Sequence, residues 1–373
     1  MVRGYVKKVF PGNNTSQGFY SFYDYIVPPD ASRVIIIKGG PGVGKSTFMG
    51  KIAEEMLKRG FDVEMHCCTA DVGSLDGILI PKLGVVIMDG MAPHMVDPKY
   101  PGALEEIVYL GEYWDSSQIK PHKKKIMELT RGSSRMYKRG YRFLKAAQLV
   151  YRDWEEANME AMDFAYANQQ THRVIEEVLG DIPISSRQGR GRHLFARAIT
   201  PAGMLNHVDT IIGPCNRKYA IEGEPGTGKS TLIKKVANAA LERGFAVEMY
   251  HCPLNPEKVE HIVIGELNVA LTKSIEPHRY FPGKDDVVIN LSEGLDGKKT
   301  AKYATLIEED REMFFILFNQ GIKFIGRAKE HHDQLETYYT PHMNFAAIAQ
   351  RREDILSEIL AYSEQIKGGG EGF

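Results

Sequence analysis

The chain has 373 residues, of which 43% are hydrophobic and 25% charged, and its formal net charge is −1. These values are typical of a soluble globular protein, and the near-neutral charge gives nucleic acid or an acidic membrane no bulk electrostatic attraction. The length accommodates two domains of about 100–200 residues each. Four cysteines are too few for a disulfide framework.

The N-terminal segment lacks the apolar core of a signal peptide. No apolar run approaches the ~18 residues that a membrane span needs. We therefore expect a cytoplasmic protein that is not embedded in a membrane.

The first predicted elements surround a glycine-rich segment. Residues 33–38 form a short apolar run, which is typical of a strand buried on both faces of a parallel sheet. Residues 39–46 follow and fit the pattern G-x-x-x-x-G-K-[ST] in full. The next segment predicts a helix that begins near Lys45 and ends at Gly60, a favourable C-cap residue. Strand, glycine loop and helix in this order predict a phosphate-binding loop.

The residue types of this loop suit a nucleoside triphosphate. Glycines let the backbone approach an anion closely, and the N–H groups of Gly42 to Ser46 are expected to point at the phosphates. Lys45 is expected to neutralise phosphate charge during catalysis, and the Ser46 hydroxyl to bind Mg²⁺. The predicted nucleotide-binding residues are Gly39, Gly40, Pro41, Gly42, Val43, Gly44, Lys45, Ser46 and Thr47.

Two further strands are predicted at 61–68 and 83–89, and the second ends in an acid. Asp89 therefore matches the Walker B aspartate that binds the Mg²⁺ side of a nucleotide site, and it is a predicted catalytic and metal-binding residue together with Lys45. Gly90 follows, where hydrolytic sites usually carry a second acid. The base that would activate water must then come from elsewhere.

Four residues are candidates for that base: Glu64, Asp71, Asp76 and His94. We expect Asp71 and Asp76 in a loop after the 61–68 strand, at the sheet edge where ligands bind in open α/β folds. A lone histidine is more often structural than catalytic. The segment His66-Cys67-Cys68 is not a predicted metal site, because neighbours along a strand point to opposite faces.

The region beyond Asp115 has a helical pattern. Apolar residues recur at steps of three and four from Phe143 to Phe164, and no Gly or Pro occurs from Tyr141 to Leu179. We expect a long helix that packs the two domains together; an arm for a partner or substrate is the alternative. Basic residues at 123–142 and 187–192 are typical of solvated surfaces, although one of these arginines is a candidate for contacting a phosphate.

The chain repeats itself. The glycine pattern recurs at 223–230, an offset of 184 residues from 39–46, and Arg59 to Met65 matches Arg243 to Met249. This period indicates a tandem duplication rather than a solenoid. The predicted fold is therefore α/β, with two P-loop domains at 1–190 and 191–373, each with a parallel sheet and a long helical segment. The second set of predicted nucleotide-binding residues is Gly223, Glu224, Pro225, Gly226, Thr227, Gly228, Lys229, Ser230 and Thr231.

The two predicted sites are not equivalent. Lys273 occupies the position of Asp89, and a cation there cannot support Mg²⁺. Only a weak metal contact is expected from Ser230. The sequence predicts a complete first site and a second site that binds phosphate but is poorly equipped for metal-dependent chemistry.

The loops, the strand order and Asp89 resemble the P-loop NTPase superfamily. The chain also resembles a family of bacterial proteins with two tandem P-loop domains, through DGMAPH at 89–94, DPKYPG at 97–102 and AITP at 198–201. Members are described as ATPases or ATP-binding proteins, so the resemblance implies ATP (or another nucleoside triphosphate) and Mg²⁺ as ligands.

The leading hypothesis is slow Mg²⁺-dependent ATP hydrolysis at the first site, with an unidentified protein partner left open. A nucleotide or small-molecule kinase is the first alternative, because a hydrolytic acid after Asp89 is missing and the basic segment at 123–142 lies where a lid would; it would need a small-molecule acceptor. A nucleotide-gated scaffold without enzymatic activity is the second. Nucleic acid is not an expected partner.

Overall fold

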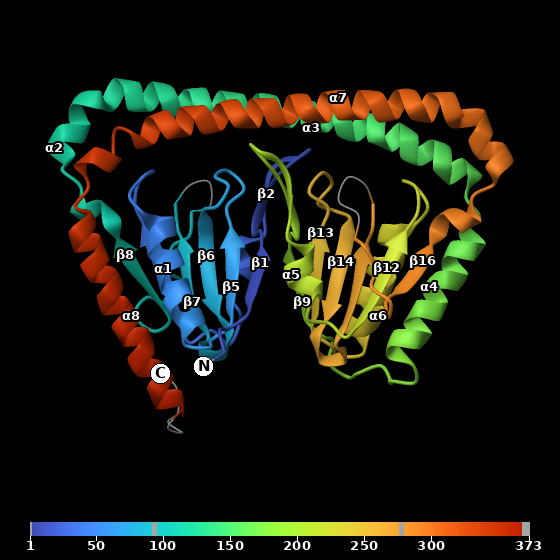
Figure 1. Cartoon of the computed structure of the whole chain (residues 1–373), viewed down its shortest axis with the longest axis horizontal. Coiled ribbons are helices and arrows are strands. Elements are labelled where there is room, and N and C mark those ends of the chain that lie inside the picture. The colour runs from blue at the N-terminus through green and yellow to red at the C-terminus, as the bar shows by residue number, and fades with distance from the viewer. Residues whose placement is uncertain (1, 92–94, 276–279, 368–373) are drawn as a thin grey trace.

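The computed structural model describes residues 2–91, 95–275 and 280–367. Figure 1 shows two α/β domains side by side beneath two long helices that run across both of them. The prediction of two similar α/β domains, each followed by a long helical segment, is confirmed. None of the described helices has the length and apolar character of a membrane span.

The first domain is built on a six-stranded sheet with the order β1-β5-β6-β7-β4-β8. All neighbours are parallel except β6, which runs antiparallel to both β5 and β7. In sheet order the strands are β1 (Val6–Val9), β5 (Val63–Cys67), β6 (Leu75–Ile80), β7 (Val85–Asp89), β4 (Arg33–Lys38) and β8 (Glu105–Tyr109). The predicted strands around 33–38, 61–68 and 83–89 are therefore present, and β6 is a strand that the sequence analysis placed in a loop.

The second domain repeats this sheet with the order β9-β13-β14-β15-β12-β16. The antiparallel strand is β14, the copy of β6. The strands are β9 (Gly191–Leu194), β13 (Val247–His251), β14 (Val259–Ile264), β15 (Val269–Lys273), β12 (Arg217–Glu222) and β16 (Val287–Asn290). Each domain also has a short hairpin, formed by β2 (Gly12–Thr15) with β3 (Gly18–Ser21) and by β10 (Arg197–Thr200) with β11 (Gly203–Asn206).

The helices are exchanged between the two halves of the chain. They are α1 (Lys45–Lys58), α2 (Ser116–Ile119), α3 (Lys123–Ala161), α4 (Phe164–Leu179), α5 (Val208–Ile212), α6 (Lys229–Glu242), α7 (Gly297–Glu336) and α8 (Phe345–Lys367). After the first sheet, α3 crosses to the second domain, where α4 packs beside α6. After the second sheet, α7 crosses back, and α8 packs beside α1 (Figure 1).

This exchange places apolar side chains of α8 in the core of the first domain. Ile355 and Ile359 are fully buried there with Phe48 and Ile52 of α1. In the second domain, α4 contributes Val174 to the core around α6. Burial of this kind stabilises by about 1.5–3 kcal/mol per large aliphatic side chain. The core of each sheet therefore depends on a helix that follows the other sheet. The predicted division at 190/191 stays a prediction.

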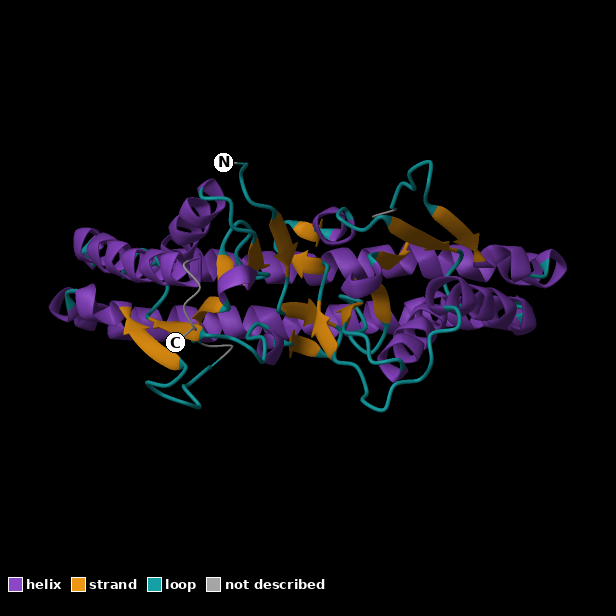
Figure 2. Cartoon of the chain, turned by 90° about the horizontal axis from the view of Figure 1, so that it is seen from below, coloured by secondary structure: helices purple, strands orange, loops and turns teal. Residues whose placement is uncertain are grey.

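The long helices α3 and α7 lie antiparallel and side by side, and both views of the chain show them together (Figures 1 and 2). Their backbones approach closely at Gly140 and Gly321, where a Cβ on Gly140 would lie 3.1 Å from the Gly321 carbonyl oxygen. Nearby, the rings of Phe143 and Phe324 stack with centroids 5.4 Å apart. Glycine at the crossing lets the backbones meet, and the predicted helical layer is the packing of these two helices.

One helix prediction needs correction. The apolar stripe from Phe143 to Phe164 suggests one continuous helix, but α3 ends at Ala161 and α4 begins at Phe164. Asp163 caps α4, because its carboxylate accepts the backbone N–H of Ala165 at 2.9 Å. The extended backbone at Met162 pairs with Leu295. The helix breaks at a polar cap and a tertiary contact, with no Gly or Pro to mark the position.

The two sheets meet through four charged side chains at the centre of the molecule. Lys7 on β1 is bonded to Glu248 at 2.6 Å and lies 3.1 Å from Glu64, while Arg192 on β9 bonds Glu64 at 2.9 Å and Glu248 at 3.3 Å. Burial raises the pKa of Glu64, but Lys7 and Arg192 lower it by more, so the carboxylate is held well below its ordinary range. Two cations and two anions neutralise one another across the interface.

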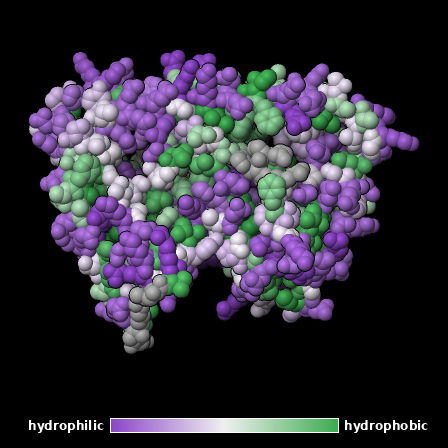
Figure 3. All heavy atoms as spheres, viewed as in Figure 1, coloured by the Kyte–Doolittle hydropathy of each residue, from purple (hydrophilic) through white to green (hydrophobic). Residues whose placement is uncertain are grey.

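The surface seen from the side of Figure 1 is mostly hydrophilic. Apolar residues on that face form scattered patches, and a notch separates the two domains at the end opposite the long helices (Figure 3). The domains are therefore joined by the helix pair, by the central charges and by contacts beside the two short hairpins, where Phe10 and Phe195 exchange backbone hydrogen bonds of 2.9 Å.

Candidate functional site

The first glycine loop (residues 39–46) connects β4 to α1, as the sequence predicts. The backbone at Gly42 and Gly44 has positive φ values of 70° and 89°, which residues with a Cβ rarely adopt. The Lys45 ammonium donates to the carbonyl oxygens of Gly39 and Gly40, both at 2.9 Å. A lysine held by the carbonyls of its own loop is in place to move to an anion that enters the loop.

Asp89 lies beside this lysine. Strand β7 pairs in parallel with β4, which puts Asp89 opposite Ile37 at the carboxyl end of the sheet. Its Oδ2 atom is 3.6 Å from Lys45 Nζ, and its Oδ1 atom accepts the Met91 N–H at 2.8 Å. Burial raises the pKa of Asp89 above its ordinary value, although Lys45 partly offsets this. The carboxylate is in a site where an additional cation would stabilise its charge.

The side chain of Ser46 also belongs to this site. It follows Lys45 at the start of α1, and its hydroxyl oxygen accepts the backbone N–H of Leu75 at 3.0 Å. Ser46 and Asp89 together offer the hard oxygen ligands that Mg²⁺ prefers. This donor set fits a magnesium ion, with a hydroxyl from the loop and a carboxylate from the neighbouring strand.

Asp76 is placed differently from the prediction. It is on strand β6 rather than in a loop, and it is 9% exposed. Burial raises the pKa of Asp76 to about 6, although hydrogen bonds from the side chains of Tyr23 and Cys68 lower it. Asp89 also raises the pKa of Asp76, so the two carboxylates repel each other. Of the predicted base candidates, Asp76 is the one whose charge interacts with both Lys45 and Asp89.

The other base candidates have different surroundings. Glu64 is one of the four central charges and is bound by Lys7 and Arg192. Asp71 accepts an ion pair from Lys329 of α7, with Nζ 3.0 Å from Oδ1. His94, and its copy His278, lie outside the described residues.

The second glycine loop (residues 223–230) has positive φ values at Gly226 and Gly228, as the first loop has at Gly42 and Gly44, and the pKa of its lysine is lowered. The Lys229 ammonium donates to Gly223 and Glu224 carbonyl oxygens at 2.6 and 2.5 Å. Burial, together with the nearby cation of Lys273, lowers the pKa of Lys229 to about 7. An anion in this loop would reverse that shift. The following residue, Ser230, lies in the first turn of α6.

Lys273, at the Asp89 position, is engaged in a buried cluster. Its ammonium donates to Glu260 Oε1 at 3.0 Å, and Arg197 pairs with the other oxygen of the same carboxylate. Burial lowers the pKa of Lys273, but Glu260 raises it by more, so this lysine stays charged. Glu260 is the copy of Asp76. The second half thus holds a paired lysine and glutamate where the first half holds two carboxylates.

Each glycine loop is covered by the long helix that begins in the other half. Above the first loop, the Thr340 hydroxyl donates to the Gly42 carbonyl at 3.3 Å. Above the second, buried Asn158 donates to the Pro225 carbonyl at 2.9 Å. The sequence analysis missed these residues, because each lies more than 60 positions from the loop it contacts. The one signal in the sequence was the helical pattern that ends near each of them.

Two arginines of the basic segments are engaged with other side chains, and the predicted contact of one of these arginines with a phosphate stays a prediction. Arg192 is bound by the central carboxylates. Arg139 of α3 packs over the ring of Phe324 at 4.6 Å from its centroid. The segment 123–142, considered as a lid, is the first half of α3 and packs on α7.

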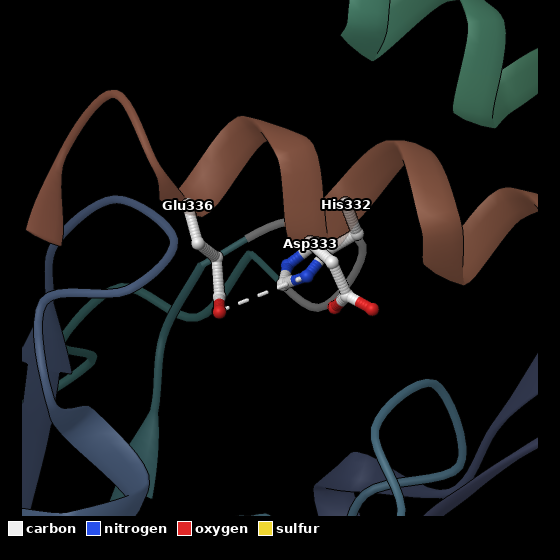
Figure 4. Close-up of side chains that lie close together, drawn as sticks. All are labelled: His332, Asp333 and Glu336. Carbon is white, nitrogen blue, oxygen red and sulfur yellow. Dashed lines mark ion pairs between the residues drawn. The ribbon is translucent and has the colours of Figure 1, made fainter.

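Potential metal ligands gather at one place in the described part of the chain. His332, Asp333 and Glu336 of α7 have ligand atoms within 4.8 Å of one another, and Figure 4 shows them on one side of the helix.

Comparisons of the chain with protein-family models, curated proteins and solved structures find no match. What defines the protein is therefore its own architecture: two α/β domains with mostly parallel six-stranded sheets and exchanged helices. Its candidate site lies at the carboxyl end of the first sheet, around Lys45 and Asp89.

Proposed function

We propose that the protein is a P-loop NTPase that binds ATP at both glycine loops and hydrolyses it slowly at the first. The observation that supports this most is the carboxylate of Asp89, 3.6 Å from the loop lysine Lys45, where the second domain has Lys273, a cation that is bound to Glu260. A free carboxylate beside the loop lysine is what metal-dependent phosphoryl transfer requires. A lysine bound to a glutamate does not supply it.

The residues of the first loop would divide the work. The N–H groups of Gly42 to Ser46 bind the phosphates, and the Lys45 ammonium moves from the carbonyls of Gly39 and Gly40 to the β- and γ-phosphates. Ser46 and Asp89 would hold Mg²⁺, which neutralises charge on the phosphate oxygens. Binding of the cation would also lower the pKa of Asp89, which burial raises.

The second loop would bind a nucleotide without efficient turnover. The pKa of its lysine, Lys229, is about 7 because the side chain is buried next to another cation. Phosphates that enter the loop would give this lysine an anionic partner. Asn158 of α3 contacts this loop, and α3 packs on α7, whose end lies against the first loop. A nucleotide bound at the second loop would therefore contact the helix pair that also covers the first loop. This arrangement favours a regulatory role for the second loop, and changes at one loop would be transmitted to the other through α3 and α7.

The test is ATP turnover by single variants of the purified full-length chain. Lys45→Ala is expected to lower Mg²⁺-dependent phosphate release by about 100-fold or more, because it removes a charge that acts on the transition state. Lys229→Ala is expected to keep turnover and to lose one of two bound nucleotides, measured by equilibrium binding. Lys51→Ala is the matched control, since Lys51 is an exposed lysine of the same helix. Turnover that survives Lys45→Ala and disappears in Lys229→Ala contradicts the assignment.

A further inference from the structure

We propose that Glu336, supplied by the second half of the chain, is the base that activates water at the first glycine loop. This inference rests on the proposed function. It answers a specific gap, because Gly90 stands where a hydrolytic acid would follow Asp89.

Two contacts fix the end of α7 over the first domain. At one side, Lys329 pairs with Asp71, with Nζ 3.0 Å from Oδ1. At the other, Thr340 donates to the Gly42 carbonyl at 3.3 Å. Asp71 precedes β6, whose Leu75 N–H is bonded to Ser46. The last turns of α7, which ends at Glu336, therefore lie between a contact with the residues before β6 and a contact with the glycine loop.

Glu336 lies within this segment, directly against the loop. A Cβ built on Gly42 would be 3.1 Å from the Cβ of Glu336 and 3.4 Å from its Cα. Figure 4 shows the carboxylate on the face of α7 that is turned towards the loops of the first domain, together with His332 and Asp333. Helical side chains lean towards the N-terminus of their helix. The carboxylate of Glu336 therefore leans along α7 towards His332, on the side of the helix that faces the loops of the first domain.

The copy of Glu336 in the first half is Glu155, which occupies the same place over the second loop. The backbone of Glu155 lies against Gly226 as that of Glu336 lies against Gly42. Its carboxylate, however, is bonded through both oxygens to the Lys258 ammonium at 2.5 Å. The first half has Ser74 where the second has Lys258. Glu336 instead lies beside the ring of His332, whose Nδ1 is 3.7 Å from Oε1, beyond hydrogen-bond distance.

The chemistry assigned to Glu336 is one proton transfer. A water oxygen forms the new bond to the γ-phosphorus, and the bond between that phosphorus and the β–γ bridging oxygen breaks, leaving ADP. Glu336 accepts one proton of the attacking water and then releases it to phosphate or solvent. Lys45 stabilises the charge on the transferred group. The base is thus contributed by the partner half, and turnover requires α7 to be seated on the loop.

The experiment uses the full chain with Lys229→Ala in the background, so that only the first loop binds nucleotide. Glu336→Gln is expected to lower the turnover number by about 100-fold or more, while the affinity for a fluorescent ATP analogue stays within about threefold. Glu330→Gln, an exposed glutamate of the same helix, is the matched control and keeps turnover.

Three outcomes would overturn the inference. Turnover within about threefold of the background after Glu336→Gln excludes a role in water activation. A parallel loss of affinity and turnover assigns Glu336 to seating the helix instead. If the chain with Lys229→Ala shows no turnover that depends on Lys45, the proposed function fails, and the role of Glu336 fails with it. That result differs from a failure of this inference alone, in which turnover depends on Lys45 and is unchanged by Glu336→Gln.

Discussion

The two domains share one backbone plan, and their carboxyl edges carry opposite charge arrangements. In the first domain, Asp76 and Asp89 repel each other beside a single lysine. In the second, the corresponding positions hold Glu260 and Lys273, which pair at 3.0 Å. The substitution at one strand end, from aspartate to lysine, turns an acidic site into a neutralised one. After duplication, a fold can therefore keep a loop that suits phosphate and lose the group that suits the metal.

The same contrast extends to the covering helices. Glu155 above the second loop is bound by Lys258, whereas the position of Lys258 is held by Ser74 in the half that carries the first loop. Each acid of the second site has thus acquired a basic partner. The acids of the first site have not acquired the matching lysines. The proposed division into a hydrolytic and a regulatory site depends on this difference. Three measurements of stability test how the two halves differ.

The largest loss of stability is expected from variants that test which domain α8 and α4 each stabilise. Ile359→Ala in α8 removes a fully buried side chain from the first core and should cost about 4 kcal/mol. Hydrogen exchange is expected to accelerate in α1 while α6 stays protected. Val174→Ala in α4, also fully buried, is the reciprocal variant and should expose α6 while α1 stays protected. Faster exchange in α6 after Ile359→Ala would contradict the exchange of helices.

The corresponding positions Asp89 and Lys273 should respond with opposite signs. Lys273→Met leaves the buried Glu260 carboxylate with Arg197 alone and should destabilise the second domain by about 3 kcal/mol. Asp89→Asn removes a carboxylate whose pKa burial has raised, so it should leave stability unchanged or raise it by less than about 1 kcal/mol. Urea unfolding followed by domain-specific hydrogen exchange measures both. Equal losses would mean that the two sites have the same electrostatics.

The smallest effect concerns the pH dependence of the first domain. The pKa of Asp76 rises from 3.8 to about 6 on folding, so the folded state binds the proton more tightly. The carboxyl group therefore does not lower the free energy of unfolding below pH 3.8. Its destabilising effect grows as the pH rises towards 6 and is complete above that pH. Asp76→Asn should raise stability by about 1–2 kcal/mol at pH 7.5 and by nothing near pH 3.5. A gain of the same size at both values would assign the effect to packing instead.

Much of each domain was predictable because the signals are local. The apolar run before Gly39, the turn that Gly42 and Gly44 make possible, and the helix beginning at Lys45 follow one another within 25 residues. The antiparallel strand β6 was missed because Asp76 and Gly77 interrupt its apolar pattern. Asp76 is tolerated in a buried strand because Tyr23 and Cys68 hydrogen-bond to it, and neither partner is adjacent in sequence.

The sequence by itself determined the duplication, the two glycine loops, and the exchange of Asp89 for Lys273, since each of these is a matter of residue identity at a fixed spacing. The tertiary structure decided which helix covers which loop. The apolar stripes of α3 and α7 are compatible with packing on either domain. In the structure the two helices pack antiparallel, with Gly140 against Gly321, and each one extends over the domain of the other half. Glu336 is brought to Gly42 by that crossing, because nearly 300 residues separate the two along the chain.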